Sequence, residues 1–232
     1  MPMTDASCYT CPNTNCLIYR NCLTPEAAPL LEKKHTIKYK KGLPFIVEGA
    51  PVFGLFFIYR GKAKVVKGGI NGREQVVRLA GNGDVVGHRG FGTGQFYPIS
   101  SVTLEDSLIC NFTNEILNKM LATFPQLTYD FMLFYARQLS ESENKVKKFA
   151  QMTVREKVID TLLYIHEKFG QANGFLNVRL SRKEIADAAG TTDEQVVRVL
   201  SSLKKEELVS VRGKQIGINY VELLKKEIAL HN

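Results

Sequence analysis

Four cysteines lie close together near the start of the chain, and they are the side chains best suited to chemistry. Cys8, Cys11, Cys16 and Cys22 fall within fifteen residues, and the only other cysteine is Cys110. Five thiols cannot complete a disulfide framework. Closely spaced thiols in a reducing compartment are more often metal ligands or redox groups, so the sequence favours those two roles over structural disulfides.

The chain offers few alternatives for catalysis. Its four histidines form no local metal or acid–base motif, and no segment has the full spacing of a phosphate-binding loop. A thiol redox enzyme is the best enzymatic alternative, because Cys8 and Cys11 form a Cys-x-x-Cys pair. Such a pair is activated at a helix start that follows a strand, whereas the neighbouring Pro and Asn residues predict a loop. We therefore expect no enzyme.

Length and composition set the frame for these residues. A chain of 232 residues is longer than one average core usually needs, which favours two domains. The start lacks an export signal and no apolar run is long enough to span a bilayer, so we expect a cytoplasmic protein that does not enter a membrane. The net charge of +8 favours a polyanionic partner, and the C-terminal third is the more basic part.

Residues 36 to 112 show the pattern of short strands. Leu55, Phe57 and Tyr59 follow a period of two, and Asn71-Gly72 is a strong signal for a hairpin turn. Several short strands at regular turn spacing predict a β-roll or barrel.

After Asn114 the pattern becomes helical. Pro125 is expected to open a long helix, along which residues recur at intervals of three and four, as in a coiled-coil seam. The seam consists of Met132, Tyr135, Leu139, Ser142, Val146 and Phe149. A narrow seam favours a homodimer, and the alternative is an amphipathic helix packed on its own β-domain. A second helix is expected over residues 153 to 169.

Residues 180 to 219 carry the most informative pattern. Ser181 with Glu184, and Thr192 with Gln195, form two capping boxes, so two helices start eleven residues apart. The small residues at 188 to 190 keep the helix crossing close. Together these features predict a helix-turn-helix.

The second helix of this motif has an outward face suited to the major groove. That face consists of Glu194, Val197, Arg198, Ser201 and Lys205. Arginine can bond guanine bidentately, glutamate can accept from cytosine, and an exposed valine can meet a thymine methyl. A following hairpin carries Arg212 and Lys214 at its tip and reads as a wing that touches phosphate. Double-stranded DNA is therefore the expected partner, and the candidate contacts also include Ser181 and Thr192.

Over nearly its whole length the chain resembles the superfamily of the cyclic-AMP receptor protein and the fumarate–nitrate reduction regulator (CRP/FNR). The matching segments are GDVVG (83–87), ARQLSESENKV (136–146), TVREKVIDTLL (153–163) and the Glu-x-x-x-Arg of Glu194 and Arg198. The resemblance implies an α+β chain with a cyclic-nucleotide-binding-like β-roll, a long dimerisation helix and a C-terminal winged helix-turn-helix. It also implies a homodimeric transcription regulator that binds palindromic DNA with TGA-type half-sites and works with RNA polymerase.

On this basis four parts are expected along the chain. They are a cysteine-rich segment (1–24), a β-roll sensor domain (25–124), a dimerisation helix (125–150) and a winged helix-turn-helix domain (151–232).

The resemblance also bears on the effector. Cyclic-nucleotide binders of the family have Gly-Glu in the β-roll and Arg-Ser or Arg-Thr further along, which hold the ribose and the phosphate. Here a histidine follows the glycine, and the later pair is Pro-Ile, so both groups are replaced. We therefore expect no dependence on cyclic AMP. The effector-pocket candidates are Gly87, His88, Arg89, Pro98, Ile99 and Ser142.

The oxygen-sensing branch of the family places cysteines before the β-roll and one more near its end. By this resemblance Cys16 and Cys22 match the last N-terminal pair, and Cys110 takes the place of the remote ligand. Four thiolates suit a [4Fe-4S] cluster, with Cys8 or Cys11 as the fourth ligand because Asn13 stands where the family has cysteine. Two alternatives stay open: a zinc knuckle made by the four N-terminal cysteines without the remote one, and thiols that bind no metal.

Overall fold

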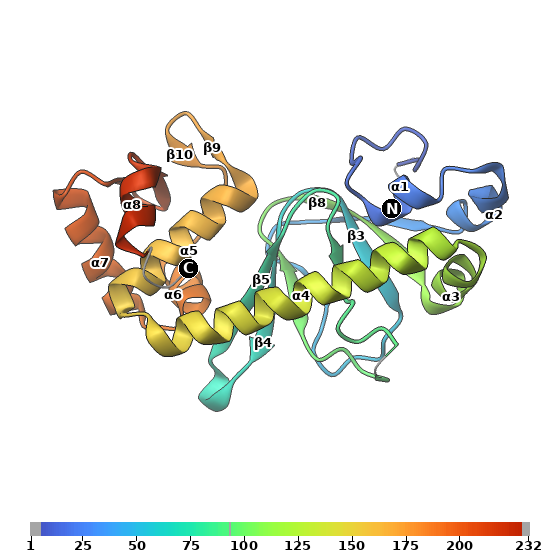
Figure 1. Ribbon diagram of the computed structural model, residues 1–232, viewed down its shortest axis with the longest axis horizontal. Coiled ribbons are helices and arrows are strands. Elements are labelled where there is room, and N and C mark those ends of the chain that lie inside the picture. Colours follow the sequence, from blue (N-terminus) through green and yellow to red (C-terminus); the bar gives the residue numbers. More distant parts are fainter. Residues whose placement is uncertain (1–5, 93, 229–232) are drawn as a thin grey trace. The chain divides into compact units, whose positions relative to one another are not determined.

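The structure is a computed structural model that describes residues 6–92 and 94–228, and it divides into two compact units (Figure 1). Unit 1 contains Met1–Gly68 and Ala80–Leu139, and unit 2 contains Gly69–Leu79 and Ser140–Asn232. None of the helices in the described ranges is long and apolar enough to cross a membrane. The predicted order of a β-rich part, a long helix and a helix-turn-helix part is confirmed.

Unit 1 begins with three short helical segments: α1 (Leu17–Asn21), η1 (Pro25–Ala27) and α2 (Ala28–Leu31). Cys16 is the N-cap residue of α1 and Cys22 is its C-cap residue, so this helix of five residues has a thiol at each end. Leu17 and Ile18 on α1 are buried in the core of the unit. The cysteine spacing is therefore the length of one buried helical turn and its two caps.

Antiparallel strands form the β-roll that follows. One sheet has the order β1 (His35–Tyr39), β8 (Ser107–Thr113), β3 (Gly54–Arg60) and β6 (Val85–Val86), and the other places β2 (Pro44–Ile46), β7 (Ser100–Thr103) and β4 (Ala63–Gly68) side by side. The register puts Cys110 on β8 opposite Thr36 on one side and Phe57 on the other. The remote thiol thus sits in the middle of a sheet, on a rigid element.

Two helices close unit 1. Thr113 caps α3 (Asn114–Thr123), and Pro125 opens α4 (Pro125–Gln151), which runs for 27 residues as predicted. At the start of α4, Leu127 and Phe131 are buried against the same apolar core as α1 and β8. Figure 1 shows the blue N-terminal segment beside this end of α4.

The apolar seam of α4 is largely exposed. Met132, Leu139 and Val146 are spaced by seven residues and have 57%, 63% and 68% of their surface accessible. Tyr135 differs, since it is partly buried and its hydroxyl donates to the carbonyl of His88 at 2.8 Å. Three large apolar side chains at heptad spacing therefore lack cover in the single chain.

Unit 2 contains η2 (Ile70–Gly72), β5 (Glu74–Ala80) up to Leu79, and the helices and short strands of the C-terminal part. Its helices are α5 (Val154–Phe169), α6 (Arg182–Ala189), α7 (Asp193–Lys205) and α8 (Val221–Glu227), and its strands are β9 (Gln171–Ala172), β10 (Phe175–Leu176), β11 (Val209–Arg212) and β12 (Gln215–Ile218). The predicted hairpin at residues 208 to 218 is the β11–β12 pair, whose register joins Arg212 to Gln215.

Local signals account for the helix-turn-helix. Both predicted capping boxes are present, with Ser181 accepting from the amide of Glu184 and Thr192 accepting from the amide of Gln195. Gly190 ends α6 with φ of +63°, a conformation that side chains with a Cβ rarely adopt. The turn between the helices is thereby fixed by residues within reach of one another along the chain.

Gly217 on β12 marks the closest backbone approach in this unit. A Cβ atom at this position would collide with the carbonyl oxygen of Gly174, which lies in the β9–β10 hairpin. Only glycine lets the wing strand and that hairpin pack at this spacing.

Candidate functional site

The second helix of the helix-turn-helix, α7, has one buried and one exposed face. Val196, Leu200 and Leu203 are buried, and Val199 is partly buried. The structure places all the predicted base-reading candidates on the exposed face: Glu194, Val197, Arg198, Ser201 and Lys205. This helix therefore has an open surface on which acidic, basic, apolar and hydroxyl groups lie together.

Polar contacts on α7 set the state of two of these side chains. A hydrogen bond from the Thr192 side chain, with a smaller contribution from nearby Arg198, holds the pKa of Glu194 below its usual range. Glu194 is therefore a carboxylate, ready to accept a hydrogen bond. The Ser201 hydroxyl donates to the Val197 carbonyl at 2.8 Å, so its hydrogen is already engaged within the helix.

The wing tip is supported from α6. Arg182 donates from Nη2 to the carbonyl of Gly213 at 2.9 Å, at the turn between β11 and β12. The guanidinium of Arg212 lies 5.5 Å from the ring centroid of Phe175, while Arg212 and Lys214 both remain exposed. Sequence reasoning missed Arg182, although it is the first residue of α6, directly after the Ser181 cap.

Arg155 on α5 joins three helices of unit 2. It forms ion pairs with Glu206 at 2.6 Å and with Glu227 at 2.9 Å, and it donates to the Ser202 hydroxyl at 3.2 Å. These carboxylates raise the pKa of Arg155 further above its usual range. The end of α7 is thus tied to α5 and α8.

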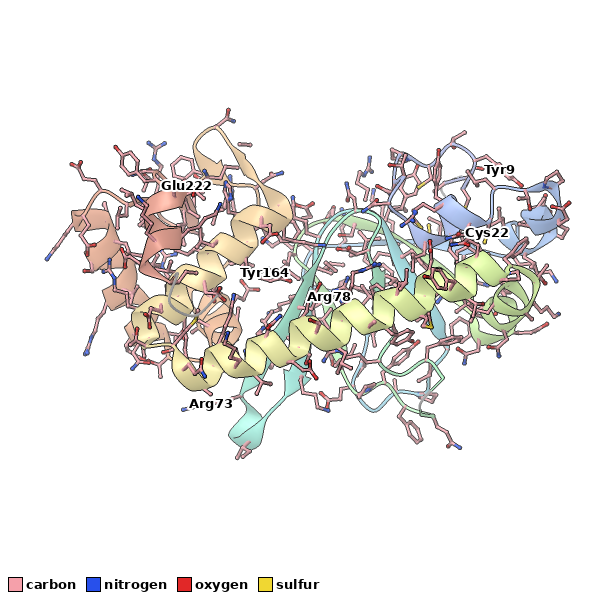
Figure 2. All side chains as sticks on the ribbon, viewed as in Figure 1. Tyr9, Cys22, Arg73, Arg78, Tyr164 and Glu222 are labelled. Carbon is pink, nitrogen blue, oxygen red and sulfur yellow. The ribbon has the colours of Figure 1, made fainter. Side chains whose placement is uncertain are left out.

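In unit 1, four thiols line one pocket, called the thiol pocket below. They are Cys8, Cys11, Cys16 and Cys110, together with Asn13, Tyr19, Lys34, Phe57, Tyr59 and other apolar residues. Cys22, which is labelled in Figure 2, differs from these four thiols. It is fully buried and does not line the pocket. All five cysteines are free thiols. The fold therefore brings the remote Cys110 together with three of the four N-terminal cysteines.

Burial determines the protonation of these thiols. It raises the pKa of Cys16 from 9.0 to about 11 and that of Cys22 to about 12, and it also raises the pKa of Cys8 and Cys110. The positive charge of Lys34 opposes the shift at Cys8 and Cys110. These four thiols are therefore neutral at pH 7 without a metal, and ligation must displace their protons.

Two polar side chains hold the wall of the thiol pocket. The buried amide of Asn13 donates to the Tyr59 carbonyl at 2.7 Å and lies 3.5 Å from the Cys11 sulfur. Lys34 donates to the Ala6 carbonyl, and its Nζ lies 3.6 Å from the Cys8 sulfur. Sequence reasoning noted Asn13 only as a missing cysteine and overlooked Lys34, which is 26 residues from Cys8 and follows no local motif.

By their chemistry, the pocket thiols suit a metal or cluster that binds thiolates. Four soft donors share one mostly apolar pocket, with a single ammonium group beside them. As placed, no three His, Cys, Asp or Glu side chains among the described residues are close enough to hold a metal ion.

The effector-pocket candidates of unit 1 are mostly packed into the fold. His88 is buried, with its ring edge-on to Phe134 at 4.9 Å and to Tyr135 at 5.8 Å. Gly87 and Ile99 are buried, whereas Arg89 and Pro98 are partly exposed. Where cyclic-nucleotide binders have a carboxylate, this chain has an imidazole packed on aromatic rings of α4. Ser142 lies exposed on the part of α4 that belongs to unit 2.

Comparisons with known proteins agree with this architecture. The cyclic nucleotide-binding domain model matches residues 36–124, and the Crp-like helix-turn-helix domain model matches residues 156–227. The fumarate and nitrate reduction regulatory protein of Vibrio cholerae is 27% identical over 201 residues, which cover 84% of this chain and 79% of the relative. The transcriptional activator protein anr of Pseudomonas aeruginosa is 27% identical over 183 residues, which cover 77% and 74%.

A solved structure supports the fold independently. FixK2 from Bradyrhizobium japonicum superimposes with a TM-score of 0.75 at 22% identity, covering 83% of this chain and 96% of that one. The two domain models match successive parts of the chain, and the two relatives and the solved structure each cover more than three quarters of it. The chain therefore belongs to the CRP/FNR family of transcription regulators, which bind DNA through a helix-turn-helix.

Proposed function

We propose that this regulator works as a homodimer on palindromic DNA with TGA-type half-sites and responds to oxygen or redox state through its thiol pocket. The observation that carries the sensing half is that Cys110 and three N-terminal cysteines line one pocket. The names of relatives that regulate fumarate and nitrate reduction support a signal of this kind. RNA polymerase is the expected protein partner by family resemblance.

The DNA-binding half rests on the exposed face of α7 and on the wing. Arg198 and Glu194 stand one turn apart on that face, which suits a guanine and a cytosine edge in the major groove. Arg212 and Lys214 at the wing supply cations for phosphate. Titration of a duplex with two inverted TGA half-sites against a duplex of scrambled sequence tests this half. Equal affinity for both at fixed salt contradicts sequence-specific reading.

The homodimer rests on the exposed seam of α4. Met132, Leu139 and Val146 form an apolar stripe at heptad spacing, and a second copy of the helix is a partner of matching shape. Leu139→Asp should shift the dimer to monomer in sedimentation, because it buries a carboxylate without a partner. Asn144→Asp, which adds the same charge away from the stripe, is the control. A wild-type chain that stays monomeric with operator DNA present overturns this part.

For the sensing half we propose a [4Fe-4S] cluster held by Cys8, Cys11, Cys16 and Cys110. The cluster, when bound, supplies lability toward oxygen. The chain's part is to offer four thiols in one pocket, with Asn13 and Lys34 fixing its wall. Cys22, which the family pattern includes, does not line the pocket, although Cys16 and Cys8 lie near enough to help raise its pKa.

Anaerobic reconstitution with iron and sulfide tests the ligand set. The wild type should gain a broad visible absorbance that air removes, and Cys110→Ser should abolish it. Cys22→Ser is the matched control and should retain it, whereas loss would place Cys22 among the ligands. If the anaerobic protein instead carries zinc that survives both air and Cys110→Ser, the site is a zinc knuckle and oxygen sensing is wrong.

A further inference from the structure

A buried carboxylate joins the cysteine-flanked helix α1 to α4. Asp130 on α4 is 7% exposed. Its Oδ2 accepts from Asn21 Nδ2 at 3.0 Å and lies 3.3 Å from Arg20 Nη2, while its Oδ1 accepts from Gln126 Nε2 at 3.2 Å. Two of these three partners come from α1, which lies 109 residues away from Asp130 along the chain.

The surroundings show that this contact is specific. Leu127 and Phe131, on either side of Asp130 in α4, are buried in the apolar core. A carboxylate next to such residues is costly unless it is paired, and both oxygens of Asp130 are used. The hydrogen bond from Asn21 is the main cause of a pKa for Asp130 below its usual range.

The geometry of α1 connects this contact to the thiol pocket. Cys16, which lines the pocket, is the N-cap of α1, and Asn21 is the last residue of the helix. The Asn21 amide also donates to the Leu17 carbonyl at 3.0 Å, so its position depends on the whole helical turn. A displacement of Cys16 therefore shifts Asn21 and Arg20 relative to α4.

We propose that Asp130 is a positioning residue that transmits the state of the thiol pocket from α1 to α4. This inference rests on the proposed sensing role of the pocket. Asp130 holds α1 in one position on α4, two residues before Met132 of the exposed seam. A change at Cys16 reaches the seam through this carboxylate, and Asp130→Asn breaks that path while keeping the side-chain shape.

Alkylation of the metal-free protein tests the attachment itself. In Asp130→Asn, iodoacetamide should label Cys16 and Cys22 about tenfold faster, the opening factor expected when a hydrogen bond to a charged group is lost. Cys110, held in the middle of a sheet on β8, should keep its rate. Mass spectrometry of the labelled peptides resolves the three sites. Equal acceleration at all three means general destabilisation and overturns the proposal.

A substitution cycle tests transmission. Hydrogen exchange of the α4 segment around residues 127–135 is measured in the wild type, Cys16→Ala, Asp130→Asn and the double variant. Cys16→Ala should change the exchange rates in the wild-type background by about threefold or more, within the coupling range of residues in one network, and should have little effect once Asp130 is replaced. If the double variant changes the exchange rates by the product of the two single-variant factors, the two residues act independently and the proposal is wrong.

The matched control is Glu115→Gln on α3, where an exposed carboxylate pairs with Lys119 one turn along the same helix. It should leave the Cys16 effect unchanged. Neither the alkylation rates nor the hydrogen exchange requires DNA, a metal or a dimer. Both measurements therefore still test the role of Asp130 if the proposed function is wrong. A cycle with full coupling but no cluster binding would reject the cluster and retain the role of Asp130.

Discussion

The helix-turn-helix and the thiol pocket are built by opposite means. In the helix-turn-helix the capping contacts join residues close in sequence, such as the Ser181 hydroxyl with the Glu184 amide three residues later. In the thiol pocket the contacts span the chain, and Asn13 reaches the Tyr59 carbonyl across 46 residues. One site is a property of a segment, whereas the other exists only when the whole unit is folded.

The largest expected effect is a loss of stability that tests whether the thiol pocket depends on the apolar core of unit 1. Phe112 is 1% exposed, packs edge-on against Phe57 and lines the pocket. Phe112→Ala should lower the free energy of unfolding by about 3–5 kcal/mol and speed alkylation of every pocket thiol. Chemical denaturation and labelling rates measure both. A stable variant with unchanged labelling would show that the pocket forms independently of the core.

The next effect concerns specificity at α7. Arg198→Ala should weaken binding to the specific duplex by about 1–3 kcal/mol and binding to random duplex by less, because a base contact is lost. Lys205→Ala, farther along the exposed face of α7, is the comparison variant. Fluorescence anisotropy at fixed salt measures all four affinities. If Arg198→Ala weakens both duplexes equally, the residue contacts only phosphate.

A smaller effect tests whether local caps fix the helix-turn-helix. Ser181→Ala and Thr192→Ala each remove an N-cap acceptor and should each cost about 0.5–2 kcal/mol of stability. Ser201→Ala removes a hydroxyl that only bonds within its own helix, so it should stay within about 0.5 kcal/mol. Thermal unfolding ranks the three variants. Equal values for all three would contradict the importance of the caps.

The smallest effect is a pH dependence of the free energy of unfolding that arises from the buried thiols. The folded protein holds the thiol protons of Cys16 and Cys22 up to a pKa of about 11 and about 12, above the ordinary 9.0. As the pH nears and passes 9, the unfolded chain loses these protons first, so this stability is complete well below pH 9 and declines as the pH nears and passes it. Urea midpoints of the metal-free protein should fall slightly from pH 8 through 8.5 to 9. This range stays below the titration of Tyr39, Tyr97 and Tyr135, whose pKa values burial also raises. The Cys16→Ala, Cys22→Ala double variant should give a flatter series, and an equally steep one would refute this assignment.

Sequence reasoning was accurate where physics is local and incomplete where it is not. The capping boxes, the outward face of α7 and the start of α4 at Pro125 were all predicted, because caps and periodicity act over a few residues. The sequence alone could not show that Cys22 is fully buried and outside the pocket lining. Its burial follows from how α1 packs into the core of the unit, and linear spacing carries no information about it.

The same limit explains Asn13 and Lys34. In the sequence Asn13 stands only for a missing cysteine and Lys34 belongs to no motif, but in the fold both form the wall of the thiol pocket. The four-part division of the chain, the base contacts and the ligand set remain predictions.

The close backbone approach at Gly217 has a consequence for genetics. Any single-base change that replaces this glycine adds a Cβ atom against Gly174 and forces the wing strand away from the β9–β10 hairpin. A random screen for chains that fail to repress or activate a reporter should therefore return Gly217 repeatedly, alongside Arg198. The first class should regain function at low temperature, since its defect lies in packing, whereas loss of a base contact should persist at every temperature.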